Sequence, residues 1–251
     1  MEKISAIVIA FNEEKNIERC LQSLDWADEI VVVDSFSTDR TLALSKKYTA
    51  RVVQHNWEGF VKQKIFATSQ ASYDWIFSID ADEEVSDQLK YEIIRIRQAG
   101  PVAQAYQMPR KMFYLGKWIT HGSWYPDYKV RLFNRQQGHW AGLDIHEYWQ
   151  VRGRSEKLKG DLLHYSYENI TYHINKINIL TSQAAAEMLQ KGEKDSYSSI
   201  LINPFIKFCK SYLLQAGFRD GFVGLIIALL GSYYVFLKYL KLWELRNNRS
   251  L

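Results

Sequence analysis

The chain has 251 residues, enough for one large domain or for a domain with an appendage, and it carries a formal net charge of +4. Hydrophobic residues make up 47% of the sequence and charged residues 24%, which excludes a wholly disordered protein. The two cysteines, Cys20 and Cys209, lie far apart, which excludes a disulfide framework or a cysteine-rich zinc site and indicates a reducing compartment.

The first hundred residues predict alternating strands and helices. The apolar stretch 4–10 is too short for a typical signal segment and is followed by acidic residues, so we interpret it as the first strand. Further strands are predicted over 29–34, 50–54 and 74–79, with helices near 13–24, 39–48 and 59–70. This alternation predicts a parallel sheet with helical crossovers, in which ligands bind at the carboxyl ends of the strands.

Polar clusters follow three of these predicted strands: "AFNEE", "DSFSTDRT" and "DADEE". The residue types of Asn12, Ser37 and Asp39 are also favoured helix N-caps, which is the structural alternative for these positions. Capping does not explain why aspartates recur where the strands end, at positions 34, 80 and 82.

The segment "IDADE" places three carboxylates within four positions, directly after a buried strand. Like charges at this spacing raise each other's pKa unless a positive group lies between them. A hard divalent cation such as Mg²⁺ or Mn²⁺ fits, because it is held by one or two carboxylates and completes its shell with water and substrate phosphates. The pattern therefore predicts a phosphate-containing substrate, most simply a nucleotide; the alternative is a solvated acidic turn.

Beyond the acidic cluster, the sequence predicts a helix over 86–98 with Ser86 as its N-cap. Two segments, 103–119 and 128–135, are predicted to be strands that flank a loop. Arg131, on the second of them, can reach a phosphate with both guanidinium nitrogens or pair with an acid at the surface.

The C-terminal part is both apolar and basic. Residues 201–251 hold seven Lys or Arg against Asp220 and Glu244, and the uncharged run 222–237 has 16 residues, fewer than the roughly 20 that span a bilayer. A buried helical hairpin, a monotopic membrane anchor and a marginal transmembrane helix are the three interpretations. We favour the anchor, on an anionic membrane surface rather than on nucleic acid, because basic residues flank both apolar segments. The predicted domains are therefore 1–198 and 199–251.

Three blocks, "IVIAFNEEKNIERCLQSL", "EIVVVDSFSTDRT" and "DWIFSIDADEE", resemble the family 2 glycosyltransferases in order and spacing. The resemblance continues more weakly through "YPDYKVRLFNRQQGHWAGLDIHE", which is similar to the bacterial branch that adds sugars to lipopolysaccharide core or related surface glycans. It implies the α/β GT-A fold, Rossmann-like with a mostly parallel sheet flanked by helices, here with a C-terminal apolar and basic helical appendage.

The resemblance also implies roles for individual residues. Asp34 matches the acid that contacts the edge of the nucleotide base. The first acid of the DxD motif, Asp80, faces the ribose or metal, and the second, Asp82, binds the metal that bridges the diphosphate. His164 matches a late histidine that some of these enzymes supply to the metal, with a packing role as the alternative. The remaining donor-binding positions that the resemblance implies are Ala10, Phe11, Asn12, Glu13 and Ala81.

An inverting transfer also needs a base for the acceptor hydroxyl. The resemblance implies an Asp or Glu after the DxD motif, often in an ED-like pair, which this sequence lacks there. In "GLDIHEYW" we favour Glu147, with Asp144 and Asp127 as further candidates, and His146 either as the base or as a residue that orients the substrate. The structural alternative for Glu147 is an ion pair with Arg152 or Arg154 on a surface turn.

Together these features predict a metal-dependent inverting glycosyltransferase that uses Mn²⁺ or Mg²⁺. It would move a hexose from a nucleotide-sugar, by resemblance a UDP-sugar, to a lipid-linked saccharide such as lipopolysaccharide core. The predicted location is the cytoplasmic face of the bacterial inner membrane. The alternatives are a phosphate-ester hydrolase of the DxD type, which Glu84 and Asn12 disfavour, and a non-catalytic nucleotide-sugar-binding scaffold at the membrane.

Overall fold

The computed structural model describes residues 1–142, 147–167, 169–193 and 196–247. The chain forms two compact units. The first comprises Met1–Lys111 and Asp127–Tyr165, and the second comprises Met112–Pro126 and Ser166–Leu251.

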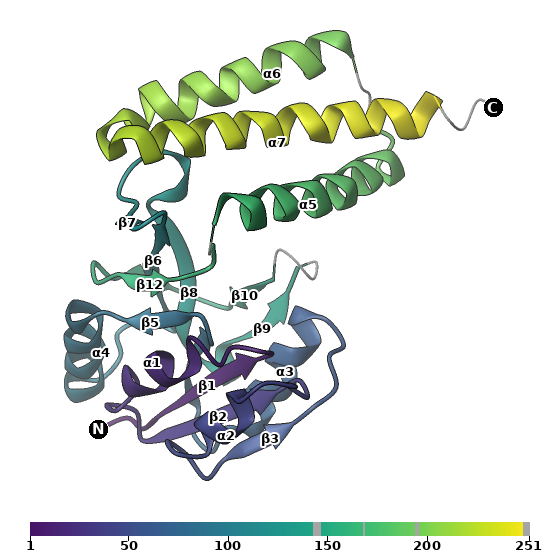
Figure 1. The fold of residues 1–251 in the computed structure, drawn as a ribbon. Helices are drawn as coiled ribbons and strands as arrows, with labels where there is room; N and C mark the ends of the chain where they lie inside the picture. Colours follow the sequence, from purple (N-terminus) through teal and green to yellow (C-terminus); the bar gives the residue numbers. More distant parts are fainter. Residues whose placement is uncertain (143–146, 168, 194–195, 248–251) are drawn as a thin grey trace. The chain divides into compact units, whose positions relative to one another are not determined.

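The first unit is built on a mixed sheet whose strand order is β3-β2-β1-β4-β8-β6-β12-β5 (Figure 1). The four N-terminal strands are mutually parallel: β1 (Ile4–Ala10), β2 (Glu29–Asp34), β3 (Val52–Gln54) and β4 (Trp75–Asp80). The others on this path are β5 (Glu83–Val85), β6 (Ala105–Tyr114), β8 (Asp127–Asn134) and β12 (Leu162–His164). Strand β11 (Ser155–Lys157) pairs with β6, and β9 (Gly138–Ala141) pairs with β10 (Tyr148–Val151) in a separate two-stranded sheet.

Helices cover both faces of the parallel strands. On β1, Ala6 and Val8 pack into one apolar cluster while Ile7 and Ile9 pack into another, as the two-residue period of a strand requires. The first cluster includes side chains of α1 (Ile17–Gln22), α2 (Thr41–Ser45) and α4 (Asp87–Ala99). The second includes side chains of α3 (Phe60–Gln70) and of the β9–β10 hairpin.

The predicted elements are largely confirmed. Strands β1 and β2 have the predicted bounds, and Ser86 caps α4 by accepting a hydrogen bond from Leu89 N at 3.3 Å. Helix α1 begins later than predicted because the preceding backbone bonds to the next loop instead. Glu13 N donates to Thr41 Oγ1 and Glu14 N donates to Asp39 Oδ2.

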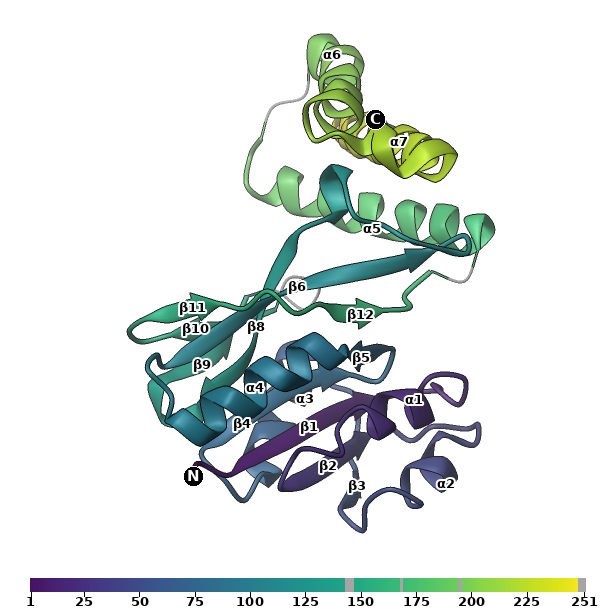
Figure 2. The ribbon, with the colours of Figure 1, turned by 90° about the vertical axis from the view of Figure 1, so that its left-hand side faces the viewer.

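The second unit is mainly helical. The end of β6 pairs with β7 (Lys117–Trp118), and α7 (Gly221–Asn247) packs against both α5 (Ile170–Gln190) and α6 (Tyr197–Cys209) (Figure 2). A π-helical turn (Lys210–Leu214) and a 3-10 turn (Gly217–Asp220) connect α6 to α7. The buried Asp220 carboxylate accepts hydrogen bonds from Thr120 N and His121 N, which attaches this connection to the β6–β7 segment.

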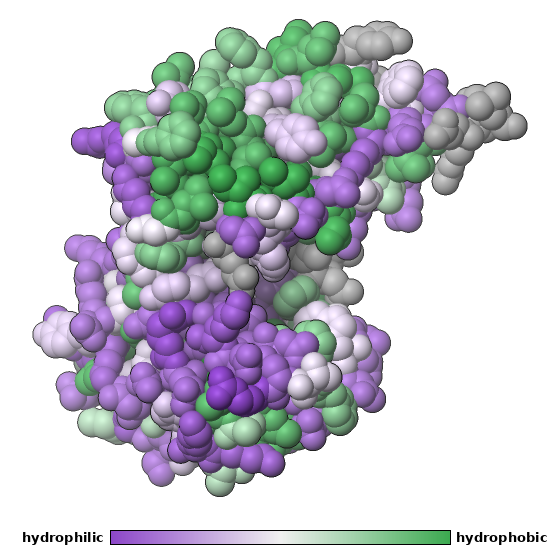
Figure 3. Space-filling view, viewed as in Figure 1, coloured by the Kyte–Doolittle hydropathy of each residue, from purple (hydrophilic) through white to green (hydrophobic). Residues whose placement is uncertain are grey.

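Apolar side chains gather on the surface of α6 and α7 (Figure 3). Within the described residues, one helical segment, Gly217–Asn247, is long and apolar enough to cross a membrane, judged by length and composition alone. The second compact unit comprises Met112–Pro126 as well as Ser166–Leu251, and so includes α5. The division into domains 1–198 and 199–251 remains a prediction. The assignment of 199–251 as the membrane-associating part remains a prediction.

Candidate active site

The loops that follow β1 and β2 are joined by hydrogen bonds. Asn12 N donates to Ser37 Oγ at 2.9 Å, and Thr38 N donates to Asn12 Oδ1 at 2.8 Å. Asn12 adopts a positive φ of 54°, which asparagine tolerates better than most residues. Asn12 and Ser37 thus connect two loops, whereas Asp39 Oδ1 accepts from Thr41 N at the start of α2.

Asp34 is fully buried at the end of β2. Its Oδ2 accepts from Ser37 N at 3.0 Å and from Gln54 Nε2 at 3.1 Å. Its Oδ1 is buried and has no hydrogen-bond partner among the described residues. A buried acceptor without a partner is costly, so this oxygen is available to a donor group of a ligand. On the neighbouring loop, Ala10 is buried and Phe11 is exposed.

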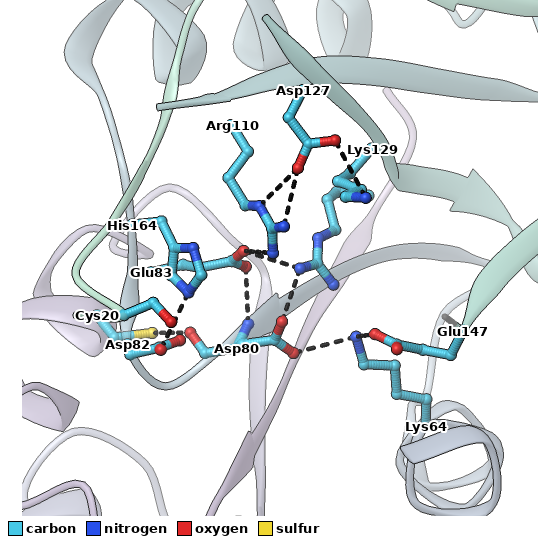
Figure 4. Close-up of polar contacts among 12 residues, drawn as sticks. Cys20, Lys64, Asp80, Asp82, Glu83, Arg110, Asp127, Lys129, Glu147 and His164 are labelled. Atoms are coloured by element: carbon cyan, nitrogen blue, oxygen red, sulfur yellow. Dashed lines mark hydrogen bonds and ion pairs between the residues drawn. The ribbon is translucent and has the colours of Figure 1, made fainter. Parts of the chain in front are cut away.

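Asp80 ends β4 with a positive side chain against each carboxylate oxygen (Figure 4). Lys64 Nζ of α3 lies 3.1 Å from Oδ1, and Arg131 Nη2 of β8 lies 2.7 Å from Oδ2. Burial alone would raise the pKa of Asp80, but the ion pairs with Arg131 and Lys64 outweigh burial and hold this pKa well below its usual range. The protein itself therefore supplies positive charge to the first acid of the motif.

These ion pairs belong to a longer alternating chain of four acids and four bases, with N···O distances from 2.7 to 3.6 Å. In order, it runs Glu147, Lys64, Asp80, Arg131, Glu83, Arg110, Asp127 and Lys129. Arg131 is buried within this chain, so the structure excludes its pairing at the surface. Its contact with a donor phosphate remains a prediction.

Asp82 lies apart from this chain and contacts a histidine. Its Oδ2 is 3.0 Å from Nε2 of His164, at the end of β12, and Ala81 between the two acids is buried. Burial acts to raise the pKa of Asp82, but His164 outweighs it, so this pKa is lowered. Burial raises the pKa of Glu13, and the charge of Asp82 adds to that shift.

The donor set of Asp82 and His164 fits Mn²⁺ or Mg²⁺, because both ions accept carboxylate oxygen and Mn²⁺ also accepts imidazole. In the described part of the chain, no group of three or more His, Cys, Asp or Glu side chains is placed to hold a metal ion. A cation at this pair would therefore complete its shell with water and substrate phosphates, as Mg²⁺ commonly does.

The two described candidates for the base lie at opposite ends of the ion-pair chain. Asp127 is held by Arg110 at 2.8 Å and Lys129 at 3.1 Å; burial acts to raise its pKa, but these cations lower it. Glu147 Oε1 is 2.8 Å from Lys64, and Oε2 makes no hydrogen bond with a described residue. Glu147 does not form the surface ion pair that was its alternative. His146 and Asp144 lie outside the described residues.

Four members of the chain were not predicted from sequence: Lys64, Glu83 as a charge partner, Arg110 and Lys129. A signal existed for Lys64, because it lies three positions before Ala67 on one face of the predicted helix, and this face, with Gln63, Ala67 and Thr68, is buried. Arg110 gives no such signal, since its partners are set by the pairing of β6 with β8.

The fold defines the class of protein. A mannosyltransferase from Pyrobaculum calidifontis, solved with GDP-Man and Mn²⁺, shares it with a TM-score of 0.55 at 15% identity, over 96% of this chain and 87% of that one. The first unit thus has the GT-A fold, as predicted. The long apolar helix of the C-terminal part belongs to the second unit.

Sequence comparison gives the family. The model of glycosyl transferase family 2 matches residues 5–153. A glycosyltransferase of Rickettsia typhi is 31% identical over 98% of this chain and 88% of its own length. The lipopolysaccharide core biosynthesis glycosyltransferase LpsC of Rhizobium meliloti is 29% identical over 96% of this chain and 92% of its own length. The chain belongs to glycosyltransferase family 2 and is an enzyme of the hexosyltransferase class.

Proposed function

We propose that this enzyme transfers a hexose or related sugar from a nucleotide-sugar to a lipid-linked saccharide, with inversion and with a divalent cation. The observation that carries the proposal is the pair formed by Asp82 and His164 where β4 and β12 end, next to the ion-paired Asp80. A site with charged carboxylates and an imidazole suits a cation that receives a diphosphate.

The donor would occupy the loops after β1 and β2. The unpartnered Oδ1 of Asp34 can accept a hydrogen bond from an N–H of the base. The exposed Phe11 offers an aromatic face directly after Ala10, the residue that pairs with Asp34 in the sheet, on a loop that is hydrogen-bonded to the loop after Asp34. By family resemblance UDP is the expected nucleotide, whereas the mannosyltransferase that shares the fold was solved with GDP-Man.

The chemistry divides between the leaving group and the acceptor. Asp82 and His164 would hold Mn²⁺ or Mg²⁺, which as a Lewis acid stabilises the departing diphosphate. Glu147 takes the proton of the acceptor hydroxyl as that oxygen bonds to the anomeric carbon and the bond to the β-phosphate oxygen breaks. We favour Glu147 over Asp127 because cations hold both oxygens of Asp127.

The second unit suits a membrane surface. Large apolar side chains, each more than half exposed, lie on α6, on its connection to α7 and at the start of α7. These are Leu201, Ile202, Phe205, Ile206, Leu213, Leu214, Phe218 and Phe222. Lys207, Lys210 and Arg219 lie among them, which favours anionic lipid.

The packing of α7 disfavours a spanning role for this helix. Lys241 Nζ donates to Asn178 O and Oδ1 and to Thr181 Oγ1 of α5. If α7 crossed the bilayer as it is packed here, these polar groups of α5 would enter the hydrocarbon with it, which is costly. We propose that the enzyme lies on the cytoplasmic face of the bacterial inner membrane, where a lipid-linked acceptor is accessible. The name of the relative LpsC is consistent with such an acceptor.

The test is release of nucleoside diphosphate from UDP-, GDP-, ADP- and dTDP-sugars with Mn²⁺ or Mg²⁺. We expect wild type to hydrolyse one donor slowly, EDTA to stop it, and Asp82→Ala to lower the rate by about 10²-fold or more. Asp25→Ala is the control, because Asp25 is exposed and pairs with Lys90 at the surface. An Asp82→Ala enzyme as fast as wild type contradicts the proposal, as does a wild type that neither hydrolyses nor binds any donor in calorimetry.

A further inference from the structure

Lys64 is a buried lysine that family 2 membership and the proposed chemistry leave unexplained. It lies on α3 with 1% of its side chain exposed, and its ammonium is 5.2 Å from the centre of the Trp140 ring. A lysine is almost never fully buried unless its charge is paired. Here the pairing is double, since Nζ is 3.1 Å from Asp80 Oδ1 and 2.8 Å from Glu147 Oε1.

The two partners do not depend on Lys64 equally. Asp80 is also held by Arg131 at 2.7 Å, and its backbone N–H donates to Glu83 Oε2 at 3.0 Å. Among the residues that the structure describes, the ion pair that Glu147 forms is the one with Lys64. Removing the ammonium therefore leaves Asp80 with a strong partner, whereas Glu147 loses the contact that fixes its direction.

We propose that Lys64 is a positioning residue that fixes the carboxylate of Glu147 relative to Asp80, and so sets the acceptor-activating group against the donor. This inference rests on the proposed function, in which Asp80 faces the donor and Glu147 receives the proton. A single ammonium joins the two carboxylates, so a shift of one is transmitted to the other (Figure 4). Rates depend steeply on such alignment, and a displacement of about 1 Å can cost about 10²-fold.

Lysine suits this role better than arginine would. Its ammonium is a compact charge with three donors, and it can contact two carboxylates that approach from different directions. A guanidinium at position 64 would keep the charge, but its planar fork would demand a different arrangement of the two acids. Lys64→Arg should therefore restore part of the function and not all of it.

The experiment is a double-mutant cycle on donor hydrolysis, with water in place of the acceptor hydroxyl. Lys64→Met is expected to lower kcat by about 10²-fold while the KM for the donor stays within about threefold of wild type. Glu147→Gln is expected to lower kcat similarly. Because Lys64 acts through Glu147, the double variant should be no slower than Glu147→Gln alone. Lys62→Met is the matched control, since Lys62 is an exposed lysine of the same helix paired with Glu58.

Two results would overturn the inference while the proposed function stands. One is a Lys64→Met enzyme with a raised KM and unchanged kcat, which would make Lys64 a donor contact. The other is a double variant whose loss in kcat is the product of the two single losses. If Lys64→Met does not fold by circular dichroism, Lys64→Arg replaces it in the cycle. The proposed function is tested separately, by whether wild type turns over a donor and Asp82→Ala does not. A wild type that neither turns over nor binds a donor contradicts the proposed function and this inference together.

Discussion

Asp80 and Asp82 are two positions apart in sequence, yet the folded protein surrounds them differently. Asp80 is held by a lysine and an arginine, and Asp82 by a histidine. Side chains of the protein therefore relieve the repulsion between the two acids. From the sequence pattern, this role was expected of a divalent ion alone.

Arg131 is expected to be essential for stability. It is buried and pairs with Asp80 and with Glu83, whose carboxylate is fully buried. In Arg131→Met the remaining cation for Glu83 is Arg110 at 3.6 Å, so the acid is left poorly compensated. We expect a loss of about 3 to 5 kcal/mol in the free energy of unfolding, measured in urea.

The matched variant for this measurement is Arg135→Met, just beyond the end of the same strand. Arg135 pairs with the exposed Asp74, so its loss should cost about 1 kcal/mol or less. Equal losses in the two variants would show that the buried pairing of Arg131 contributes no more than a surface pair.

His173 predicts a pH dependence of stability. It is buried on α5 with Nδ1 2.9 Å from Tyr114 Oη, and burial, aided by the charge of Lys176, lowers its pKa to about 4. The unfolded chain, with an ordinary pKa near about 6.5, binds more protons between these values, so stability falls as the pH drops through this range. The loss from this residue should be up to about 1.4 kcal/mol per pH unit.

Urea unfolding checks this expectation at pH values of about 6.5, 5.5 and 4.5, which lie between the pKa values of His173 in the unfolded and folded protein. His173→Phe should flatten the dependence relative to wild type, whereas His139→Asn, at an exposed histidine, should not. A dependence that is unchanged in His173→Phe would contradict the assignment.

Different elements bring the charges of the site together. Helix α3 contributes Lys64 from one face of the sheet, and β8 and β6 contribute Arg131 and Arg110. Strand β8 pairs antiparallel with both β4 and β6, which places its arginine beside the acids that end β4. The site thus depends on strand order, because its eight charges come from α3, β4, β5, β6, β8 and the residue before β10.

The exposed face of α6 and its connection to α7 should control membrane binding. Phe205→Asp and Leu214→Asp are each expected to weaken binding to vesicles with anionic lipid by about tenfold or more, because a buried apolar side chain contributes about 1.5 to 3 kcal/mol. Sedimentation with vesicles measures this. Val102→Asp, at an exposed apolar residue of the first unit, is the control.

An alkaline carbonate wash completes that test. An anchor that lies on the surface should be released by the wash, whereas a spanning α7 would stay in the membrane. Retention of the protein after the wash, or full binding by both aspartate variants, would contradict the proposed surface.

At the scale of the whole molecule, the residues proposed for donor chemistry and those proposed for membrane association belong to different compact units. The site residues of the ion-pair chain, with Asp82 and His164, all lie in the first unit. The basic excess of the sequence lies in residues 201–251, within the second unit.

The sequence by itself determined the parallel strands and the acids at their ends. Strands β1 and β2 were predictable to the residue because a strand buried on both faces is a continuous apolar run, and Asp34, Asp80 and Asp82 follow such runs directly. These are local features, readable from neighbours along the chain.

Only the tertiary structure decided which positive groups meet those acids. Lys64 and Glu147 are 83 positions apart, and Arg131 and Asp80 are 51 apart, so their pairing depends on how α3, β4 and β8 are arranged. Local propensity carries no information about such contacts, because strand order and helix placement set them through burial of the whole core.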